Sequence, residues 1–367
     1  MPVVRSVVYL TYHFPPEVGG IQTRISKYID RLSKRGIRVK VLVAGRIPIV
    51  QGMALGAEVV PCPGGMRRLP VSVKLVTRSV IDSRADVVHV FTGSSTLLGV
   101  YALAIAKLTG AKPVISLFGR EDFEFAGVVP RTLFRFSTVL ADSIDVNSAA
   151  TGSLLPKELR PKVHVLLGAA EEPSKRTSQD VNSPPMLLFV GRLVARKGVD
   201  DLLRAFAMVR SRIPNARLSI VGDGPEMRDL VRLAEQLDLL DGVEFKGTLI
   251  GPKLDQEYER CNVFVLPSKD VASDPANEGL GLALIEASMH AKPLVGTSHG
   301  GIPEIVKEGE NGLLVPPGDP DALAGAIVTV LTNPDEARAM GASALRGAMS
   351  RFSWDRATDV LLESYTQ

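Results

Sequence analysis

The sequence predicts an α/β protein of two domains, each built on a doubly wound parallel sheet. Short runs rich in valine and isoleucine alternate with helical patterns, which is typical of parallel strands covered by helices on both faces. The alternation stops at a polar segment and then restarts, and 367 residues exceed the usual size of a single hydrophobic core. Such sheets bind ligands outside the carboxyl ends of their strands, so we expect the functional residues in the loops that follow the strands.

The N-terminal half contains six predicted strands and a clear amphipathic helix. In residues 21–34 the apolar side chains recur at helical spacing on one face, and Gly36 supplies the stop. The longest apolar stretch, residues 97–108, falls short of the roughly 20 residues that a bilayer span needs, so it predicts a buried helix. The predicted strands are residues 3–10, 39–43, 87–91, 114–118, 144–147 and 163–167.

A polar, proline-containing segment without periodicity, residues 171–185, predicts a linker between two domains. We expect these domains at residues 1–170 and 186–350, facing each other across a cleft. The last segment, residues 351–367, contains a predicted helix from 354 to 365 that is expected to pack back on the first domain. The strand pattern of the second domain covers residues 186–190, 217–221, 243–246, 263–266, 294–296 and 313–315.

Composition and charge exclude several classes of protein. A formal net charge of +3 is too small to indicate a nucleic-acid partner, although it permits contact with an anionic membrane surface. The two cysteines, Cys62 and Cys261, and five histidines without metal-ligand spacing predict neither a disulfide framework nor a metal site. Because no secretory signal and no spanning segment is visible, we expect a cytoplasmic protein that can associate peripherally with the inner face of the cell membrane.

Two cations on one strand–helix loop predict a diphosphate site. Gly191-Arg192 ends a predicted strand, and Lys197-Gly198 opens the next helix. An arginine fork and a lysine point charge on one loop can both point at one diphosphate, whereas the alternative is two solvated loop charges. Their position at the carboxyl end of a strand favours the functional interpretation.

The segment from Glu278 to Glu286 predicts one wall of a nucleotide-sugar site. The two carboxylates stand eight positions apart, with the turn Gly279-Leu280-Gly281 after the first and a predicted helix at residues 282–291 around the second. The N-terminus of a helix offers unpaired N–H groups and a partial positive charge to a diphosphate. A carboxylate one turn further along can accept hydrogen bonds from both hydroxyls of a ribose.

A glycine pair, Gly19-Gly20, opens the first predicted helix. Glycines at such a strand–helix junction let the backbone approach a phosphate or a substrate closely, and a plain tight turn is the alternative. His13 stands beside this turn and has the best functional claim among the histidines.

Taken together, these motifs resemble the retaining GT-B glycosyltransferases of family 4, the group 1 glycosyltransferases. The fold that this implies is two Rossmann-like domains that face each other across a cleft, with the acceptor side in the first and the nucleotide-sugar side in the second. The resemblance rests on an ordered set of motifs that spans most of the chain: Phe14-Pro15-Pro16-Glu17-Val18-Gly19-Gly20, Val190-Gly191-Arg192 with Lys197-Gly198, Val221-Gly222-Asp223-Gly224-Pro225, Glu278 through Glu286, Gly300-Gly301-Ile302-Pro303-Glu304, Asn311-Gly312-Leu313-Leu314-Val315 and Gly318-Asp319-Pro320.

The resemblance implies a role for each predicted site residue. Arg192 and Lys197 would neutralise the donor diphosphate and stabilise the leaving nucleoside diphosphate. Glu278 would contact the donor sugar near the anomeric carbon, and Glu286 would hold the ribose hydroxyls. No metal or other cofactor is implied, since the nucleotide-sugar, a GDP- or UDP-sugar, is a co-substrate. The remaining donor contacts would be Gly19, Gly20, Gly191, Gly279, Leu280 and Gly281.

One position departs from the family pattern. Members often carry a His-Gly pair after the fourth strand, where this chain has Phe118-Gly119. Phenylalanine cannot hydrogen-bond a sugar hydroxyl, so either Arg120 or Glu121 compensates or the substrates differ from the common case. His13, Phe118, Arg120 and Glu121 are therefore the candidate residues on the acceptor or sugar side.

The implied activity is transfer of a hexose of the mannose or glucose type to a lipid or glycan acceptor. The loops around Gly19 and Glu278 look closest to those of the phosphatidylinositol mannosyltransferases. An anionic membrane surface is a further expected partner, because residues 66–83 combine basic and apolar side chains at helical spacing; an ordinary helix with a solvated basic side is the alternative. A UDP-sugar epimerase of the same fold and a non-catalytic nucleotide-binding protein are the alternative functions.

Overall fold

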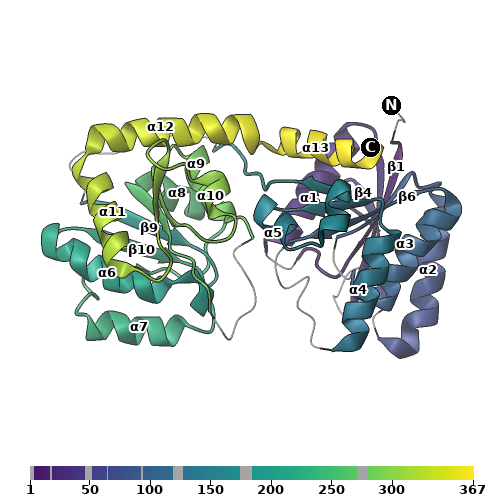
Figure 1. The fold of residues 1–367 in the computed structure, drawn as a ribbon, viewed down its shortest axis with the longest axis horizontal. Coiled ribbons are helices and arrows are strands. Elements are labelled where there is room, and N and C mark those ends of the chain that lie inside the picture. The colour runs from purple at the N-terminus through teal and green to yellow at the C-terminus, as the bar shows by residue number, and fades with distance from the viewer. Residues whose placement is uncertain are drawn as a thin grey trace. The chain divides into compact units, whose positions relative to one another are not determined.

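The chain forms two compact units in the computed structural model (Figure 1). Unit 1 comprises Met1–Gly168 together with Trp354–Gln367, and unit 2 comprises Ala169–Ser353. Each unit has its own largely parallel sheet, which confirms the predicted α/β class with two doubly wound domains. The structure describes residues 4–16, 19–45, 52–63, 65–91, 94–118, 127–173, 184–271 and 279–367.

Unit 1 contains an eight-stranded sheet with the order β3-β4-β2-β1-β5-β6-β7-β8. Neighbouring strands are parallel except β3 and β4, which pair antiparallel. Val7 of β1 pairs with Val39 of β2 on one side and Val87 of β5 on the other. The strands are β1 (Ser6–Thr11), β2 (Arg38–Gly45), β3 (Gly52–Ala54), β4 (Ala57–Pro63), β5 (Val87–Val90), β6 (Lys112–Leu117), β7 (Ser143–Val146) and β8 (Val163–Val165).

Alternate residues of the central strands of unit 1 contact different sets of helices. Val8 and Leu10 belong to the apolar core that includes residues of α2 and α3, whereas Tyr9 and His89 contact α13. This alternation follows from the two-residue repeat of a strand. α2, α3 and α4 lie side by side (Figure 1). The helices are α1 (Gly20–Lys34), η1 (Met66–Arg68), α2 (Leu69–Asp82), α3 (Leu97–Thr109), α4 (Val128–Leu140), α5 (Ala149–Ser153), η3 (Lys157–Lys162) and α13 (Trp354–Thr366).

A buried polar network joins the C-terminal helix α13 to the sheet of unit 1. The Tyr365 hydroxyl lies 2.8 Å from Nδ1 of His89 and 3.2 Å from the hydroxyl of Tyr9. Ser364 donates a 3.2 Å hydrogen bond to Oδ2 of Asp145. Buried polar groups are costly when they lack a partner, so these pairings fix the position of α13 along the sheet.

Unit 2 contains a six-stranded parallel sheet with the order β11-β10-β9-β12-β13-β14. Counted from its first strand, this is the order of a Rossmann sheet, in which the direction of winding reverses next to the first strand. The strands are β9 (Met186–Val190), β10 (Arg217–Val221), β11 (Val243–Phe245), β12 (Val263–Leu266), β13 (Leu294–Thr297) and β14 (Gly312–Val315).

The helices of unit 2 connect these strands and continue after the last one. Asp319 caps one of them, α11, by accepting a 2.9 Å hydrogen bond from the backbone N–H of Ala322. The helices are η4 (Ala195–Lys197), α6 (Val199–Arg212), α7 (Met227–Gln236), α8 (Pro252–Arg260), α9 (Leu282–Met289), α10 (Ile302–Ile305), α11 (Pro320–Thr332) and α12 (Pro334–Arg351).

The predicted elements differ from the observed ones at a few places. The six strands predicted in the first half of the chain do not include β3 or β4, and β4 contains two residues that weaken a strand pattern, Pro61 and Pro63. Both prolines lie beyond the part of β4 that pairs with β3, where a strand tolerates proline. The helix predicted at 282–291 ends at Met289, since Ala291 adopts a left-handed conformation with φ +56°.

Two further sequence expectations concern single segments. The helix predicted at 66–83 consists of a 3₁₀ turn, η1, followed by α2. Most of the predicted linker, residues 174–183, lies outside the described residues. In the part of the chain that the structure describes, no helix is both long enough and apolar enough to cross a membrane.

Candidate active site

The carboxyl edge of the unit 2 sheet gathers loops from both sides of the switch point. The order of strands reverses at β9, whose neighbours are β10 and β12. The loop after β9 carries Gly191, Arg192 and Lys197, and the loop after β12 leads toward Gly279 and α9. Open α/β sheets bind their ligands at this crevice. The donor-side residues that the structure describes in unit 2 therefore lie where this fold favours a ligand.

Lys197 lies beside Gly191 at the end of β9. Its Cε is 3.8 Å from the position that a Cβ on Gly191 would take, and the ring of Phe189 is 3.1 Å from that position. A side chain at residue 191 would therefore crowd both the lysine and the core. Arg192 follows directly and is exposed to solvent. The loop thus carries two cations next to a glycine that leaves room for a ligand.

Two glycines of the next strand–helix turn shape the β9 loop. The backbone N–H of Leu193 donates a 2.9 Å hydrogen bond to the carbonyl of Asp223. A Cβ on Gly222 would collide with the carbonyl oxygen of Gly191, and one on Gly224 would collide with that of Leu193. Glycine alone permits so close an approach of two backbones. This motif therefore supports the predicted diphosphate loop through its backbone.

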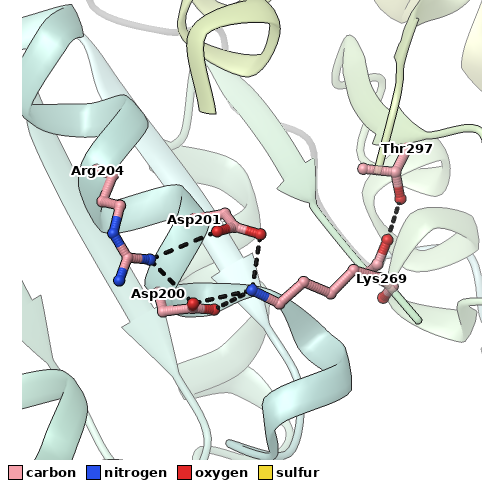
Figure 2. A network of polar contacts seen from close by, with 6 residues as sticks. Asp200, Asp201, Arg204, Lys269 and Thr297 are labelled. Carbon is pink, nitrogen blue, oxygen red and sulfur yellow. Dashed lines mark hydrogen bonds and ion pairs between the residues drawn. The ribbon is translucent and has the colours of Figure 1, made fainter. Parts of the chain in front are cut away.

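A charged network ties the β12 loop to α6 (Figure 2). The Lys269 ammonium lies 2.8 Å from both carboxylate oxygens of Asp200 and 2.8 Å from Oδ2 of Asp201, and Arg204 donates a 2.9 Å hydrogen bond to Asp200. Burial disfavours the charged forms, but hydrogen bonds between opposite charges outweigh it. They lower the pKa of Asp200 and raise the pKa of Lys269. Asp200 and Lys269 are therefore both ionised at neutral pH.

Backbone contacts join the same two loops. The N–H of Lys269 donates a 2.8 Å hydrogen bond to the carbonyl of Arg196. A Cβ on Gly198, which has φ +64°, would collide with the carbonyl oxygen of Pro267, so glycine lets the two loops touch. The hydroxyl of Thr297 at the end of β13 donates to the carbonyl of Ser268. The β12 loop is thus fixed between the predicted diphosphate loop and β13.

The turn Gly279-Leu280-Gly281 leads directly into α9. Gly281 is the N-cap of α9 and has φ +80°, a conformation that favours glycine. Leu280 is 3% exposed, so its side chain belongs to the core and its backbone is the part that a ligand can reach. A Cβ on Gly301 would collide with the carbonyl oxygen of Gly279, which shows how tightly this turn packs before α10.

Tyr258 of α8 holds Glu286 in the second turn of α9. The Tyr258 hydroxyl donates a 2.6 Å hydrogen bond to Oε2 of Glu286, and Oε1 makes no hydrogen bond to the described part of the chain. Tyr258 is 1% exposed and stacks on His290, with ring centroids 5.1 Å apart and an angle of 18°. Burial raises the pKa of Glu286, whereas the bond from Tyr258 acts in the opposite direction. One carboxylate oxygen is thereby fixed, and the other can accept from a ligand.

In unit 1 the predicted residues lie at the carboxyl end of β1, which is the switch point of that sheet. His13 is exposed, and its backbone N–H donates a 3.1 Å hydrogen bond to the hydroxyl of Thr11. Gly19 is the N-cap of α1, and Gly20 is the first residue of that helix. The structure therefore brings His13, Gly19 and Gly20 to one strand–helix junction.

Phe118 directly follows β6 and packs on another aromatic ring and a buried cation. Its ring stacks on Phe91 with centroids 6.4 Å apart, and the guanidinium carbon of Arg24 lies 5.4 Å from its centroid. Arg24 is 6% exposed and donates a 3.1 Å hydrogen bond to the carbonyl of Leu166. The face of the Phe118 ring stabilises the Arg24 cation. The phenylalanine that replaces the family's histidine therefore packs on a buried arginine in this chain.

Three predicted site residues, Glu278, Arg120 and Glu121, lie outside the described residues. Within the described ranges, no three histidine, cysteine, aspartate or glutamate side chains are grouped so that they could hold a metal ion.

Sequence reasoning missed Tyr258, Lys269 and Arg24. Each meets its partner only through the fold: Tyr258 and Glu286 are 28 positions apart, and Lys269 and Asp200 are 69 apart. No local motif marks such pairs. The one available signal was the position of Lys269 just after a predicted strand, where functional loops begin.

Comparison with known sequences assigns a family to unit 2. The model of the family described as "Glycosyl transferases group 1" matches residues 171–346. Over 367 aligned residues, 95% of each chain, the sequence is 28% identical to the GDP-mannose-dependent alpha-(1-6)-phosphatidylinositol monomannoside mannosyltransferase of Mycobacterium tuberculosis. It is 27% identical to the sulfoquinovosyl transferase SQD2 of Arabidopsis thaliana, over 93% of this chain and 69% of that protein.

Solved structures share the fold over nearly the whole length. Anabaena HepE in complex with UDP has a TM-score of 0.78 at 19% identity, with 98% of this chain and 99% of that chain covered. The sucrose-phosphate synthase from Thermosynechococcus elongatus has a TM-score of 0.80 at 21% identity, with 98% of each chain covered. At these identities the likeness shows the fold, which is that of GT-B enzymes. Residues 171–346 match the group 1 glycosyltransferase family, and the chain as a whole resembles glycosyltransferases in sequence and in fold.

Proposed function

We propose that the protein transfers a hexose from a nucleotide-sugar to a lipid or glycan acceptor with retention of anomeric configuration, and that GDP-mannose is the donor. The observation that carries this proposal is the pair of contacts in unit 2: Glu286, fixed by Tyr258 at 2.6 Å, and Lys197, placed beside Gly191. A carboxylate for ribose hydroxyls and cations for a diphosphate are what a nucleoside diphosphate requires. The mannosyltransferase relative supports the choice of GDP-mannose.

Arg192 and Lys197 are the proposed catalytic cations. In the transfer, the bond from the anomeric carbon to the diphosphate breaks, a bond to the acceptor oxygen forms, and the acceptor proton passes to the leaving phosphate. Negative charge grows on the diphosphate as its bond breaks, so fixed cations there lower the barrier. We propose that this leaves no requirement for a metal ion, and EDTA is expected not to change the rate.

The other donor contacts follow from the same arrangement. Glu286 would accept from the ribose hydroxyls, and the backbone of residues 279–281 would donate to the sugar or the phosphate. Glu278, Gly19 and Gly20 stay predicted donor contacts. Each would be tested by its own alanine variant.

The acceptor is proposed to bind in unit 1, around His13 and the loop that follows Phe118. That loop includes Arg120 and Glu121, and we propose that one of the two makes the hydrogen bond that Phe118 cannot make; substrates that differ from the common case are the alternative. A lipid acceptor is supported by the mannosyltransferase relative, whose name describes action on a phosphatidylinositol monomannoside. The same relative supports two further proposals: that the protein contacts an anionic membrane surface, and that it is cytoplasmic and peripheral to the membrane.

The decisive experiment supplies labelled GDP-mannose or UDP-glucose with lipid and glycan acceptors. Expected results are release of the nucleoside diphosphate, a labelled product of retained configuration by NMR, and strong loss of turnover in Glu286→Ala and Lys197→Ala. Lys253→Ala, an exposed lysine at the start of α8, is the matched control. Absence of turnover with every donor and acceptor would overturn the proposal, and isomerisation of the donor without an acceptor would indicate an epimerase.

A further inference from the structure

Helix α4 of unit 1 exposes an unusual set of side chains. Val128 is 79% exposed, Val129 68%, Phe136 56% and Val139 69%. These residues, together with the exposed Arg131 and Arg135, are called the α4 face below. At 100° per residue they fall on one side of the helix.

The opposite side of α4 is the one that packs against the protein. Phe134 and Leu140 contact the apolar core of unit 1, and the buried Ser137 donates a hydrogen bond to the carbonyl of Ser94. The helix therefore buries a serine while it leaves Phe136 in solvent. Exposed apolar side chains that cluster in this way indicate a surface that is covered by a partner.

The charges of the α4 face indicate the chemistry of that partner. Residues 127–141 contain two arginines and no carboxylate. Neither Arg131 nor Arg135 forms an ion pair with the described part of the chain. At 100° per residue both guanidinium groups lie along one edge of the exposed apolar side chains, an arrangement that matches the phosphates and acyl chains of an anionic lipid surface. A second copy of the same face would instead bring like charges together without a carboxylate to pair them.

We propose that the α4 face is the surface by which this protein docks on an anionic lipid bilayer. The proposal rests on the proposed function, because it places a lipid-directed transferase on the membrane that holds its acceptor. Helix α2, expected from the sequence to meet the membrane, fits less well. It exposes only Val71 and Ile81 as large apolar residues, and its Arg78 pairs with Asp82 at 3.0 Å.

The test measures binding to vesicles in the absence of donor and acceptor. Vesicles of phosphatidylcholine with about one-third phosphatidylglycerol, and vesicles of phosphatidylcholine alone, are sedimented with the full chain at low and high salt. The wild type is expected to prefer the anionic vesicles. Phe136→Gln with Val139→Gln should lower the partition coefficient about tenfold or more at either salt concentration. Arg131→Gln with Arg135→Gln should lower it about tenfold at low salt and less at high salt.

The controls come from α12, where Met349 is 48% exposed and Arg346 is exposed nearby. Met349→Gln and Arg346→Gln should bind vesicles like the wild type. The proposal is overturned if the wild type ignores anionic vesicles, if the α4 variants bind as the wild type does, or if only Lys74→Gln with Arg78→Gln in α2 abolishes binding. It is equally overturned if the α4 variants merely convert a dimer to a monomer in analytical ultracentrifugation without a change in vesicle binding.

Transfer to a short-chain acceptor in free solution is measured in parallel, and the α4 variants should retain it. Vesicle binding that depends on the α4 face without any transfer would refute the proposed function and leave the docking surface standing. Transfer to the short-chain acceptor without vesicle binding that depends on the α4 face would refute the docking surface and leave the proposed function standing.

Discussion

The hydroxyl of Tyr258 donates a 2.6 Å hydrogen bond to Oε2 of Glu286 and joins α8 to α9 at the carboxyl edge of the unit 2 sheet. The tyrosine is buried and stacked on His290, so its hydroxyl has little freedom to move. This hydrogen bond fixes the orientation of the Glu286 carboxylate and favours its ionised form. We therefore regard Tyr258 as a positioning residue for Glu286.

Tyr258→Phe removes that hydroxyl and keeps the ring. Loss of a hydrogen bond to a carboxylate is expected to weaken nucleoside diphosphate binding about tenfold. The pKa of Glu286, already raised by burial, should rise further, so the acid limb of binding moves to higher pH. Isothermal titration at several pH values measures both effects. Tyr101→Phe, which loses a 2.6 Å contact with Thr77 in unit 1, is the matched control.

A dideoxynucleoside diphosphate separates positioning from a general loss of structure. It lacks both ribose hydroxyls, so it should bind the wild type and Tyr258→Phe with the same affinity. An equal loss for both nucleotides would show that the tyrosine does not act through Glu286.

Lys197→Ala is expected to lower kcat/KM about a hundredfold, because a cation at the leaving diphosphate stabilises charge that grows in the transition state. Lys197→Arg should restore part of the rate. Lys253→Ala should behave as the wild type, since that lysine is exposed at the start of α8. Steady-state kinetics with the best donor are the measurement, and wild-type kinetics in Lys197→Ala would refute the proposed diphosphate site.

Lys269→Met should destabilise unit 2. The variant leaves the carboxylates of Asp200 and Asp201 without the ammonium that lies 2.8 Å from each. Asp200 and Lys269 retain 34% and 19% side-chain exposure, so solvent screening limits the cost to about 1–2 kcal/mol of unfolding free energy.

Urea unfolding measures this cost, and Asp201→Asn in the Lys269→Met background should recover part of it by removing one of the like charges. Lys269→Arg keeps the charge and should be milder. If Lys269→Met unfolded like the wild type, the network would contribute nothing to stability.

Asp145→Asn should change how stability depends on pH. Burial raises the pKa of Asp145 to about 7 and lowers the pKa of His89 to about 3, and Nε2 of His89 lies 3.8 Å from Oδ2 of Asp145. The folded state therefore binds an extra proton at Asp145 between about pH 4 and about pH 7, so this residue makes stability fall as pH rises through that window. His89 has the opposite effect, since stability is lost as pH falls from about 6.5 toward about 3.

In Asp145→Asn only the effect of His89 remains at this site. The difference in unfolding free energy between the variant and the wild type should then shift in favour of the variant as pH rises from about 4 to about 7. Denaturant titrations across this interval give that difference, in which contributions of the other carboxylates cancel. A difference that is constant with pH would contradict the assignment.

Phe118→His tests the departure from the family pattern. The variant loses the aromatic face on which Arg24 lies, so unfolding free energy should fall by about 1 kcal/mol. Arg24 nearby disfavours a second positive charge, and the introduced imidazole should be neutral at pH 7. We expect transfer activity that is unchanged or higher, measured as kcat/KM. A large loss of activity would show that Phe118 itself serves the reaction.

The regular elements of unit 2 could be predicted because their pattern is local. β9, β10 and β12 occupy the predicted residues, since buried parallel strands are continuous apolar runs bounded by turns. β4 was not predicted. Its two prolines weaken the strand pattern in the sequence, and a strand tolerates them here because they lie beyond the part of β4 that pairs with β3.

The candidate site shows the same division. Gly191 and Lys197 share one loop, and Gly281 and Glu286 share one turn and helix, so spacing alone placed them together. Arg24 under Phe118, Lys269 on Asp200 and the exposure of Phe136 follow from packing between distant segments. The apolar periodicity of α4 does not predict which side of the helix packs against the core, because the helix buries Ser137 and exposes Phe136.

The sequence by itself determined two α/β domains and the positions of their main strands along the chain, and it predicted the loops of the candidate site, because strand periodicity, glycine turns and helix starts are encoded within a few residues of each other. Only the tertiary structure decided that Tyr258 orients Glu286, that Lys269 joins two loops, and that α4 is left uncovered. The physical reason is that a side chain's partner and its exposure depend on which distant segment packs against it, and no local pattern carries that information.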